Sequence, residues 1–570
     1  MDDQAWFKQF TTSEDYGVMR DRPVVYFCAE YALNDDIHTY AGGLGILAGD
    51  IIREAAEKEI PFVAVGLYYH EGYLHNDLYQ GGIMMKSAPR ISPAGVNLVP
   101  VVDQDGKRII VELPIQEEVV YAQAWSLQIG NVHVYLLDTY LPQNSEENKQ
   151  ITDCLYVSSK ELRFKQELVL GLGGLRLLEA LKIEPSGYHL NEGHSALLAL
   201  EIARWEMRKN NRTFEQEIEN AKKHIFFSNH TLVPAGNDIF HADLASRLLS
   251  GFAKELNVPV DEVMKLGLFG ESGFFSMTLL ALRMASKANA VSRLHATKAA
   301  EIWKDYPMSP ITNGIHIKTW DSLANTHSPK EMWEKHQQNK RVLLDFIRTE
   351  TGTSWDENTL LLGWARRIVT YKRPLSLFEN LELFKSLAES SDRPIRVVIS
   401  GLSHKDDSEG LAMFKHIEQI VKKDLKGLVV YLPDYRMSTA KLLVSGCDVW
   451  LNTPSVGFEA CGTSGMKAAL NGVLPCSTND GWVAEANLYA VGWLLQNESL
   501  SNDILSVLGK QIAPLYYAKD SGDFSEHWVK MMQNARDMTL NQFSATKMLR
   551  KYIEEFYLIA IHAHQLEKSA

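Results

Sequence analysis

Cysteine is scarce in this sequence and follows no pattern. Five cysteines occur among 570 residues, at Cys28, Cys154, Cys447, Cys461 and Cys476, and no two of them form a C-x-x-C pair. An odd number of scattered cysteines in a large chain argues against a disulfide framework. Metal-type spacings such as H-E-x-x-H are also missing, as is the G-x-S-x-G turn of acyl-transfer enzymes. We therefore expect no metal and no acyl-transfer chemistry of that kind.

Long apolar runs and leader sequences are missing as well. The longest apolar stretch, near 168–183, is interrupted by Arg176, Glu179 and Lys182, so it falls short of the ~20 apolar residues that a membrane span needs. The first six residues carry neither the basic region nor the apolar core of a secretory signal. These absences predict a soluble, cytoplasmic protein with no membrane partner.

The sequence also lacks a basic excess. Its 58 Lys and Arg residues stand against 71 Asp and Glu, which gives a net charge of −13. Proteins that bind nucleic acid usually carry a basic surplus or stripe, so we expect no nucleic-acid partner. An acidic protein can still bind an anion where positive charge is gathered locally.

What the sequence does contain is a series of short apolar strands, each followed by a polar turn and a helical pattern. At roughly 100–200 residues per domain, the length predicts two large domains. Strands that alternate with helices form parallel sheets covered on both faces. We therefore predict an α/β protein of two doubly wound, Rossmann-like domains facing a cleft. The predicted strands are 23–33, 60–69, 132–139, 187–194, 223–231, 308–316, 358–367, 394–401, 427–434, 449–455 and 474–481.

The predicted domain boundary falls after the sixth of these strands. Residues 1–319 would form the N-terminal domain, with an antiparallel insertion near 97–130, where Asp105-Gly106 between apolar runs is a hairpin signal. Residues 320–546 would form the second domain. Ligands of doubly wound sheets bind at the carboxyl ends of the strands, so the polar loops there should converge on the cleft.

The densest group of candidate residues is 459–467, Glu-Ala-Cys-Gly-Thr-Ser-Gly-Met-Lys, between an apolar strand and an apolar helix. Gly462 and Gly465 allow the backbone to approach a ligand, and the Thr-Ser pair between them provides good N-caps. A helix that begins here would offer N–H groups and a positive dipole end to a phosphate. Lys467 would lie on its first turn and point to the same cleft. The segment alone is also compatible with a capped helix and a solvated lysine.

Two further segments suggest anion binding. Residues 40–50, Tyr-Ala-Gly-Gly-Leu-Gly-Ile-Leu-Ala-Gly-Asp, place three glycines within four positions before a helix, which makes either an anion nest or a plain tight turn. Residues 366–373, Arg-Arg-Ile-Val-Thr-Tyr-Lys-Arg, gather four cations at a predicted strand end. Arginine suits bidentate phosphate contacts, although a solvated basic turn is the alternative. Arg436 adds a cation at the end of another predicted strand.

Three polar loops complete the set of candidates. They are Asn-Glu-Gly-His at 191–194, Ser-Asn-His-Thr at 228–231 and Thr-Asn-Gly-Ile-His at 312–316, each at the end of a predicted strand. Such loops offer the hydrogen bonds that sugar hydroxyls require. Taken singly, each histidine is more often a cap or a satisfied core residue than a catalyst.

Together these segments resemble the α-glucan phosphorylase family of glycogen, starch and maltodextrin metabolism, in its short bacterial-type form. The resemblance implies the glycosyltransferase-B fold, with a C-terminal helix in 547–570 that crosses back to the N-terminal domain. It also implies pyridoxal phosphate bound covalently to Lys467 in the second domain, with inorganic phosphate and an α-glucan or maltooligosaccharide as substrates. Many relatives form homodimers, although no interface pattern is visible in this sequence. The matching segments are 30–31, 40–50, 66–69, 72–73, 190–194, 229–231, 277–278, 291–295, 311–314, 366–373, 433–436, 459–472 and 480–481.

The resemblance also implies roles for single residues. The residues implied in catalysis are Lys467, Arg367, Lys372 and His230. The residues implied in cofactor binding are Lys467, Tyr31, Arg366, Arg436, Gly462, Thr463 and Gly465. The residues implied in substrate binding are Gly42, Gly43, Leu44, His194, Asn313, Glu459, Cys461 and Gly462, with Arg367 and Lys372 on the phosphate and His230 on the glucosyl unit.

The implied reaction is retaining phosphorolysis of the terminal α-1,4-linked glucose to α-glucose 1-phosphate. In this family the 5′-phosphate of the cofactor, rather than its ring, lies against the substrate phosphate. Two adjacent anions repel each other, so such a site needs a surplus of positive charge. No convincing carboxylate pair of the glycosidase type is visible, which agrees with a phosphate-driven route.

The sequence departs from the family pattern at three places. Ala235 stands where a glutamate is usual, Cys461 stands where a serine is common, and 401–405 reads Gly-Leu-Ser-His-Lys instead of Gly-Lys-Ala-His-Pro. These changes leave the sugar contacts and the preferred glucan length open.

Two alternative functions remain open at this point. A nucleotide-sugar glucosyltransferase of the glycogen-synthase type shares the fold, but it would need an acidic side chain where Met466 and Lys467 stand. A glucan-binding homologue that has lost its activity would share the fold and the site.

Overall fold

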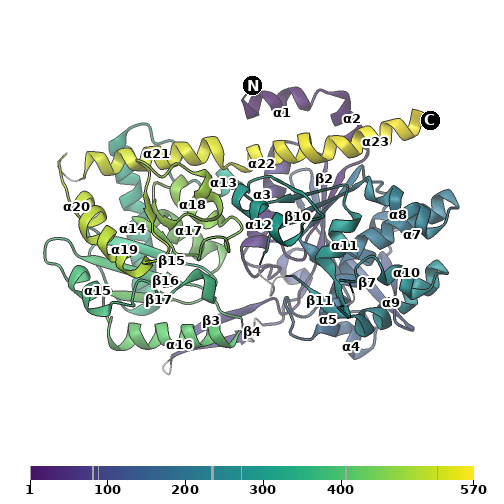
Figure 1. Cartoon of the computed structure of the whole chain (residues 1–570), viewed down its shortest axis with the longest axis horizontal. Helices are drawn as coiled ribbons and strands as arrows, with labels where there is room; N and C mark the ends of the chain where they lie inside the picture. Colours follow the sequence, from purple (N-terminus) through teal and green to yellow (C-terminus); the bar gives the residue numbers. More distant parts are fainter. Residues whose placement is uncertain are drawn as a thin grey trace.

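Two large sheets, one in each half of the chain, organise the molecule into two lobes (Figure 1); the first is mostly parallel and the second is entirely parallel. Helices cover both faces of each sheet, as predicted for doubly wound domains. The computed structural model describes residues 2–79, 82–87, 89–232, 237–270, 272–404, 407–520, 522 and 524–569, with only the backbone described for 74–79, 82–87 and 566–569.

The sheet of the N-terminal half has the strand order β14-β13-β10-β9-β1-β2-β8-β7-β5, with β6 paired to β7. The strands from β14 to β8 run parallel to their neighbours, whereas β7 pairs antiparallel with β8, β5 and β6. This antiparallel edge falls within the segment predicted as an insertion. The strands are β1 (Val24–Phe27), β2 (Phe62–Leu67), β5 (Val99–Pro100), β6 (Ile110–Ile115), β7 (Glu118–Ile129), β8 (Val132–Asp138), β9 (Gly187–Asn191), β10 (Ile225–Asn229), β13 (Lys287–Ala290) and β14 (Met308–Pro310).

The sheet of the C-terminal half has the order β17-β16-β15-β18-β19-β20, and all of its neighbours are parallel. Two small antiparallel pairs lie outside the main sheets. The strands of the second sheet are β15 (Leu360–Ala365), β16 (Ile395–Ser400), β17 (Val429–Leu432), β18 (Val449–Asn452), β19 (Leu474–Thr478) and β20 (Trp493–Leu495). The small pairs are β3 (Leu74–Tyr79) with β4 (Gly82–Ser87) and β11 (Ile239–His241) with β12 (Phe274–Ser276).

The α-helices cover the sheets and join the lobes. Those of the N-terminal half are α1 (Asp3–Phe10), α2 (Glu14–Asp21), α3 (Gly43–Glu57), α4 (Glu146–Lys149), α5 (Lys160–Leu168), α6 (Gly174–Ala180), α7 (Leu198–Asn210), α8 (Phe214–Lys222), α9 (Ala242–Leu256), α10 (Val260–Met264), α11 (Met277–Met284) and α12 (Arg293–Ile302). The others are α13 (Ile317–Trp320), α14 (Pro329–Thr351), α15 (Leu381–Ala388), α16 (Ser408–Lys423), α17 (Met437–Gly446), α18 (Thr463–Leu470), α19 (Leu500–Val507), α20 (Ala513–Tyr516), α21 (Glu526–Gln542), α22 (Ala545–Tyr552) and α23 (Leu558–Ser569).

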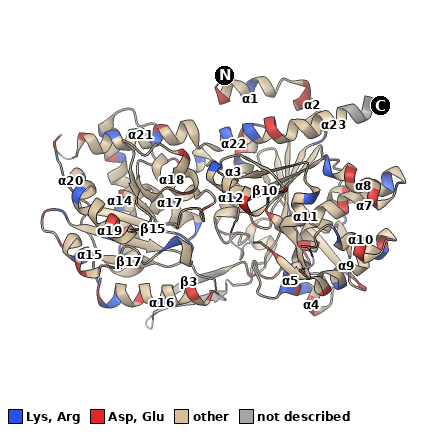
Figure 2. Ribbon diagram, in the orientation of Figure 1, with Lys and Arg blue, Asp and Glu red and all other residues tan. Residues whose placement is uncertain are grey.

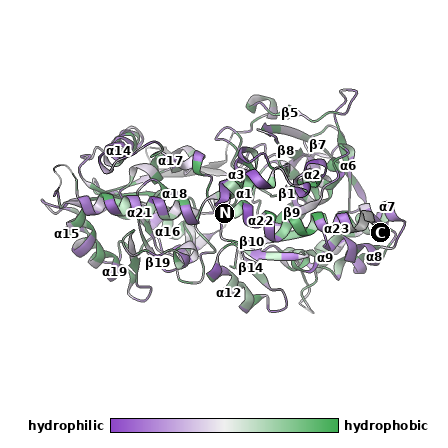
Figure 3. Ribbon diagram, turned by 90° about the horizontal axis from the view of Figure 1, so that it is seen from above, coloured by the Kyte–Doolittle hydropathy of each residue, from purple (hydrophilic) through white to green (hydrophobic). Residues whose placement is uncertain are grey.

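The first sheet is buried on both faces. Along β1, Val24 and Tyr26 pack into one hydrophobic core, whereas Val25 and Phe27 pack into another. This follows from the geometry of a strand, in which successive side chains point to opposite faces. Viewed from above, hydrophilic and hydrophobic residues alternate along the helices that cover the sheets (Figure 3).

The C-terminal helices return to the N-terminal lobe and cover one face of its sheet (Figure 1). Tyr557 of the segment between α22 and α23 is hydrogen-bonded through its hydroxyl to His189 Nδ1 at 2.8 Å, and the ring of Phe556 stacks on Phe226 at 5.2 Å. Because all four side chains are fully buried, the last helices form part of the core.

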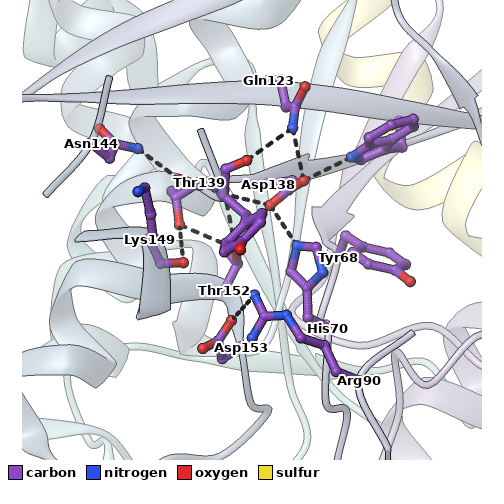
Figure 4. Close-up of polar contacts among 12 residues, drawn as sticks. Tyr68, His70, Arg90, Gln123, Asp138, Thr139, Asn144, Lys149, Thr152 and Asp153 are labelled. Atoms are coloured by element: carbon purple, nitrogen blue, oxygen red, sulfur yellow. Dashed lines mark hydrogen bonds and ion pairs between the residues drawn. The ribbon is translucent and has the colours of Figure 1, made fainter. Parts of the chain in front are cut away.

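A buried carboxylate ties the antiparallel edge to the parallel sheet. Asp138 accepts hydrogen bonds from His70 Nε2 (2.9 Å), Trp125 Nε1 (2.9 Å), Gln123 Nε2 (3.0 Å) and Thr152 Oγ1 (3.3 Å) (Figure 4). Burial alone would raise the pKa of Asp138, but these donors, led by His70, lower it. Because both oxygens are satisfied by side chains of the fold, we assign the cluster a structural role.

Acidic and basic residues are interspersed along the outer helices of both lobes (Figure 2). Within the described residues, no helix has both the length and the apolar composition to cross a bilayer. The same residues contain no group of three or more His, Cys, Asp and Glu side chains arranged to hold a metal ion.

Candidate functional site

The carboxyl ends of the strands bring most of the candidate residues to the seam between the two lobes. Hydrogen bonds cross this seam, because Ser292 Oγ of the first lobe donates to the Ala460 carbonyl at 2.6 Å. Thr312 Oγ1 likewise donates to the carboxylate of Glu485 at 2.9 and 3.0 Å. The glycine-rich start of α3 faces the second lobe from the same side, as the contacts below show.

Lys467 is buried at this seam, with 5% of its surface exposed. It lies on the second turn of α18, not the first as predicted, because the helix begins at Thr463. Its Nζ donates to Thr463 Oγ1 at 3.1 Å and lies 4.5 Å from the centroid of the Trp320 ring. Burial lowers the pKa of Lys467 to about 8, although the nearby Asp50 acts in the opposite direction. A lysine with a lowered pKa supplies neutral amine at neutral pH, which a Schiff-base lysine requires.

The N-terminus of α18 is left open by a glycine. Gly462 is the N-cap, in the left-handed conformation with φ 83°, and no side chain caps the helix. The prediction that Thr463 and its neighbour serve as caps is therefore wrong, since Thr463 is already the first helical residue. A Cβ at Gly465 would lie 2.9 Å from the Trp482 ring, so the helix packs there without room for a side chain. The uncapped N–H groups are suited to an anion.

Two of the four predicted cations share one carboxylate. Arg366 Nη2 and Lys372 Nζ donate to Glu459 Oε2 at 3.0 and 3.1 Å. Burial alone would raise the pKa of Glu459, but the two cations lower it to about 2. Arg366 is 5% exposed, and its Nη1 has no hydrogen-bond partner among the described residues. A buried, unused guanidinium donor is costly, and it indicates an anionic ligand.

The other two cations of this segment differ from each other. Arg367 is exposed to solvent, and Tyr371 of the same loop interacts with its guanidinium group. Arg373, by contrast, donates to three main-chain carbonyls at 2.7–3.0 Å. The expectation that all four cations serve an anion is therefore wrong for Arg373, which fastens the loop. The three carbonyls belong to Thr453, Pro454 and Asn497.

Arg436 lies just before α17 and is partly exposed. It forms an ion pair with Asp434. The N-terminus of α17 is held by the first lobe, because Met437 N donates to the Tyr40 hydroxyl at 3.0 Å and the following N–H donates to Asp35 Oδ2 at 3.0 Å. The loop before α3 therefore fixes Arg436 near the seam.

The glycine-rich loop presents an open helix end. Gly42 caps α3 without a side-chain bond, and a Cβ at Gly42 or Gly43 would meet no atom within 4 Å. Leu44 follows on the first turn and is partly buried. The main-chain N–H groups of Ala41 and Gly42 both donate to Glu30 Oε2, at 2.8 and 3.1 Å. This carboxylate shapes the loop, and the open space at the helix end suits an anion.

Several buried polar atoms at the strand ends of the first lobe have no partner among the described residues. They are His194 Nδ1, both polar side-chain atoms of Asn229, His295 Nε2 and Asn313 Oδ1. Buried polar groups are nearly always hydrogen-bonded in native proteins. A hydroxyl-rich ligand at this end of the sheet would supply the missing partners.

His230 is held by two neighbours from β9 and its loop. Its main-chain N–H donates to Glu192 Oε2 at 2.8 Å, and its Nε2 is hydrogen-bonded to Asn191 Oδ1. Burial lowers the pKa of His230 to about 3, so the imidazole is neutral and is no proton donor at neutral pH. Burial also raises the pKa of Glu192 to about 8. The arrangement fixes the peptide unit at His230.

Tyr31 and Cys461 are both buried, but in different surroundings. The hydroxyl of Tyr31 donates to the carbonyls of Tyr26 and Val65, at 2.8 and 3.0 Å, inside the hydrophobic core. Tyr31 is therefore held within the core, and its contact with the cofactor stays a prediction. Cys461 lies directly before Gly462, and burial raises the pKa of its thiol, so it remains protonated. Ala235 lies outside the described residues.

Sequence reasoning missed Asp50 and Trp320. Asp50 is 1% exposed, and both of its oxygens lie 3.0 Å from Trp320 Nε1. One signal for Asp50 was available, because it follows Gly43 by seven positions and therefore lies on the same face of the helix two turns later. No comparable signal marked Trp320.

Glu459→Gln should lower the free energy of unfolding at neutral pH by about 3 kcal/mol. The folded-state pKa of Glu459 is about 2, below its ordinary 4.5, so the ionised carboxylate stabilises the fold fully above 4.5. This contribution is lost as the pH falls toward 2, and wild type and variant should converge there. Denaturant unfolding at a series of pH values measures the difference. The exposed Glu382→Gln serves as control, and a gap that persists at acid pH would contradict the prediction.

Comparison with known proteins gives consistent results. The family described as "Carbohydrate phosphorylase" matches residues 311–491. A maltodextrin phosphorylase of Thermococcus litoralis is 33% identical, over 95% of this chain and 71% of that protein. Glycogen phosphorylases of Mycobacterium tuberculosis and Aquifex aeolicus are each 31% identical, over 94% of this chain and 70% and 86% of those proteins.

Proposed function

The chain belongs to the carbohydrate phosphorylase family, and from this premise we propose that it releases terminal glucose from an α-1,4-glucan by phosphorolysis. The products are α-glucose 1-phosphate and a glucan shortened by one unit. The observation that carries the proposal is the burial of Lys467, with its pKa lowered to about 8, at the open end of α18. The named relatives are phosphorylases, so a nucleotide-sugar glucosyltransferase is not favoured.

Pyridoxal phosphate fits the residues around Lys467. Attached to that lysine, it would lie beside Arg366, whose Nη1 has no partner among the described residues. Gly462, Thr463 and Gly465 leave the N–H groups at the start of α18 uncapped for its phosphate. When bound, the cofactor supplies a second phosphate group that exchanges a proton with the substrate phosphate.

The substrate phosphate would bind between the lobes. Arg367 is exposed toward solvent. Lys372 lies close by and is hydrogen-bonded to Glu459. Gly42 and Gly43 offer an open helix end on the opposite side. These groups would hold the phosphate oxygens, neutralise their charge and leave one oxygen to approach the sugar.

The glucosyl unit would bind at the strand ends of the first lobe. Asn313 Oδ1 and His194 Nδ1 are buried without partners among the described residues, and Glu459 offers a carboxylate that stays ionised. The fixed peptide at His230 would face the developing positive charge of the sugar, while its neutral imidazole binds a hydroxyl. Retention of configuration follows because phosphate delivers the proton and attacks on the same face.

The purified protein provides the direct test. Borohydride treatment followed by mass mapping should place a pyridoxyl adduct on Lys467, and incubation with maltooligosaccharide should release glucose 1-phosphate only when inorganic phosphate is present. A protein that takes up no pyridoxal phosphate would refute the proposal. Adduct formation without phosphate-dependent turnover would favour the inactive, glucan-binding alternative.

A further inference from the structure

A buried carboxylate and a buried amine meet on the same indole ring at the seam. Asp50 of α3 accepts the Nε1–H of Trp320, with 3.0 Å to each carboxylate oxygen. The face of the same indole carries Lys467 Nζ, 4.5 Å from the ring centroid. Asp50 is 1% exposed and Lys467 5%. The contact joins the helix that follows the glycine-rich loop to the lysine of the second lobe.

The charged groups around this pair come from several elements. From α3, Arg53 Nη1 lies 3.8 Å from Asp50 Oδ1. His316 acts on Asp50 from the segment after β14, and the Cys461 thiol acts on Lys467 from the loop before α18. From α17, Lys441 Nζ lies 6.0 Å from the centroid of the Trp320 ring. Among the groups named in this paragraph, Asp50 is the carboxylate that acts on Lys467.

These groups act on the two buried charges in opposite ways. Burial lowers the pKa of Lys467, Asp50 raises it, and Arg53 lowers it further. Burial raises the pKa of Asp50, and Lys467 is the foremost of the groups that lower it. A buried charge is tolerated better when an opposite charge is close, so each member of this pair favours the ionised form of the other, while burial still leaves the pKa of Lys467 lowered and that of Asp50 raised.

We propose that Asp50 is a positioning residue for Lys467, holding its amine against Trp320 and setting the fraction of it that is neutral. The consequence for catalysis rests on the proposed function. There Lys467 would hold pyridoxal phosphate covalently through its amine, and this attachment would require the neutral form of the amine. Asp50 would then control how readily Lys467 takes up the aldehyde as the pH changes.

The test measures the titration of Lys467 in the full-length protein after removal of any cofactor. Acetic anhydride acetylates the neutral amine, with loss of acetate and a proton, and peptide mass mapping gives the extent at Lys467 across a pH series. The wild-type midpoint is expected near the pKa of about 8. In Asp50→Asn the midpoint should fall by about one pH unit or more, because a nearby opposite charge shifts a pKa by that amount.

The control is a second buried carboxylate, one turn further along the same helix. Glu54 is 2% exposed and accepts a hydrogen bond from Thr546 Oγ1 at 2.7 Å. Glu54→Gln should leave the midpoint of Lys467 unchanged. A midpoint that stays at the wild-type value in Asp50→Asn, or that moves equally in both variants, would overturn the proposal.

A second variant reverses the expected sign. Arg53→Met removes a cation that lowers the pKa of Lys467, so the titration midpoint of Lys467 should rise. This variant provides the test of the proposal if Asp50→Asn does not fold. No rise in Arg53→Met would then count against the proposal. The labelling needs neither cofactor nor activity. A wild type that never binds pyridoxal phosphate would therefore defeat the proposed function and leave the role of Asp50 to be judged by the midpoints.

Discussion

Replacing Lys467 with alanine is expected to abolish attachment of pyridoxal phosphate and to lower kcat/KM for phosphorolysis on the order of 1,000-fold or more, as for other residues on which a catalytic unit depends. The physical reason is that the amine is the group that forms the bond. Its neighbours Thr463 and Trp320 contact the amine but carry no primary amine that could form the same bond. Borohydride trapping and a glucose 1-phosphate assay measure the two effects separately.

Lys467→Arg is the matched control for charge. It keeps a cation beside Asp50 and the Trp320 ring, so the fold should be retained, as thermal unfolding can verify. A guanidinium stays protonated in proteins and forms no stable adduct with the aldehyde. Both variants should therefore be inactive. Substantial phosphorolysis by Lys467→Arg would show that covalent attachment at this position is not needed.

Gly43→Val is expected to lower kcat/KM for phosphate about 100-fold, a typical cost of displacing a bound reactant, while leaving the stability of the protein nearly unchanged. A Cβ at Gly43 would meet no atom within 4 Å, so the fold has room for the side chain. That room is the space into which the open end of α3 faces, and the added methyl groups would occupy it. Initial rates at varied phosphate, with thermal unfolding alongside, measure both quantities.

Gly45→Ala provides the opposite case on the same loop. A Cβ at Gly45 would lie 2.5 Å from the Tyr40 Cβ and 2.9 Å from Glu30 Oε2. The main effect of this variant should therefore be a loss of stability, in contrast to Gly43→Val. If Gly43→Val were as active as the wild type at low phosphate, the start of α3 would not be the phosphate site. A loss of stability in Gly43→Val equal to that in Gly45→Ala would also contradict the assignment.

Much of the fold was predictable because it depends on local patterns. Each predicted strand contains a strand of the structure, since short apolar runs between polar turns are specified locally. In the two main sheets, β13 and β20 were missed, and the strands of the two small antiparallel pairs were not predicted either. β13 reads Lys-Ala-Asn-Ala and β20 is three residues long, so neither has an apolar run to detect. Their place in the sheets comes from parallel neighbours that lie far away in the sequence.

The site was predictable only in part, because residue type does not reveal what a side chain contacts. The sequence does not distinguish Arg366 from Arg373. In the structure, Arg366 has a buried donor without a partner among the described residues, whereas Arg373 donates to main-chain carbonyls. Arg373 has φ 47°, a backbone conformation that no residue pattern announced. Asp50 and Trp320 are separated by 270 positions, and no periodicity links them.

The return of α22 and α23 to the first lobe has a consequence for biosynthesis. On the ribosome, β1 to β14 emerge long before the residues that cover one face of their sheet. Until Phe556 and Tyr557 arrive, the apolar side chain of Phe226 has no cover from them. Domains generally fold as they emerge, and exposed apolar faces on such intermediates invite aggregation. The nascent first lobe must therefore wait, partly open, until α22 and α23 have been synthesised, and a chain truncated before α22 could not close the core of its first lobe.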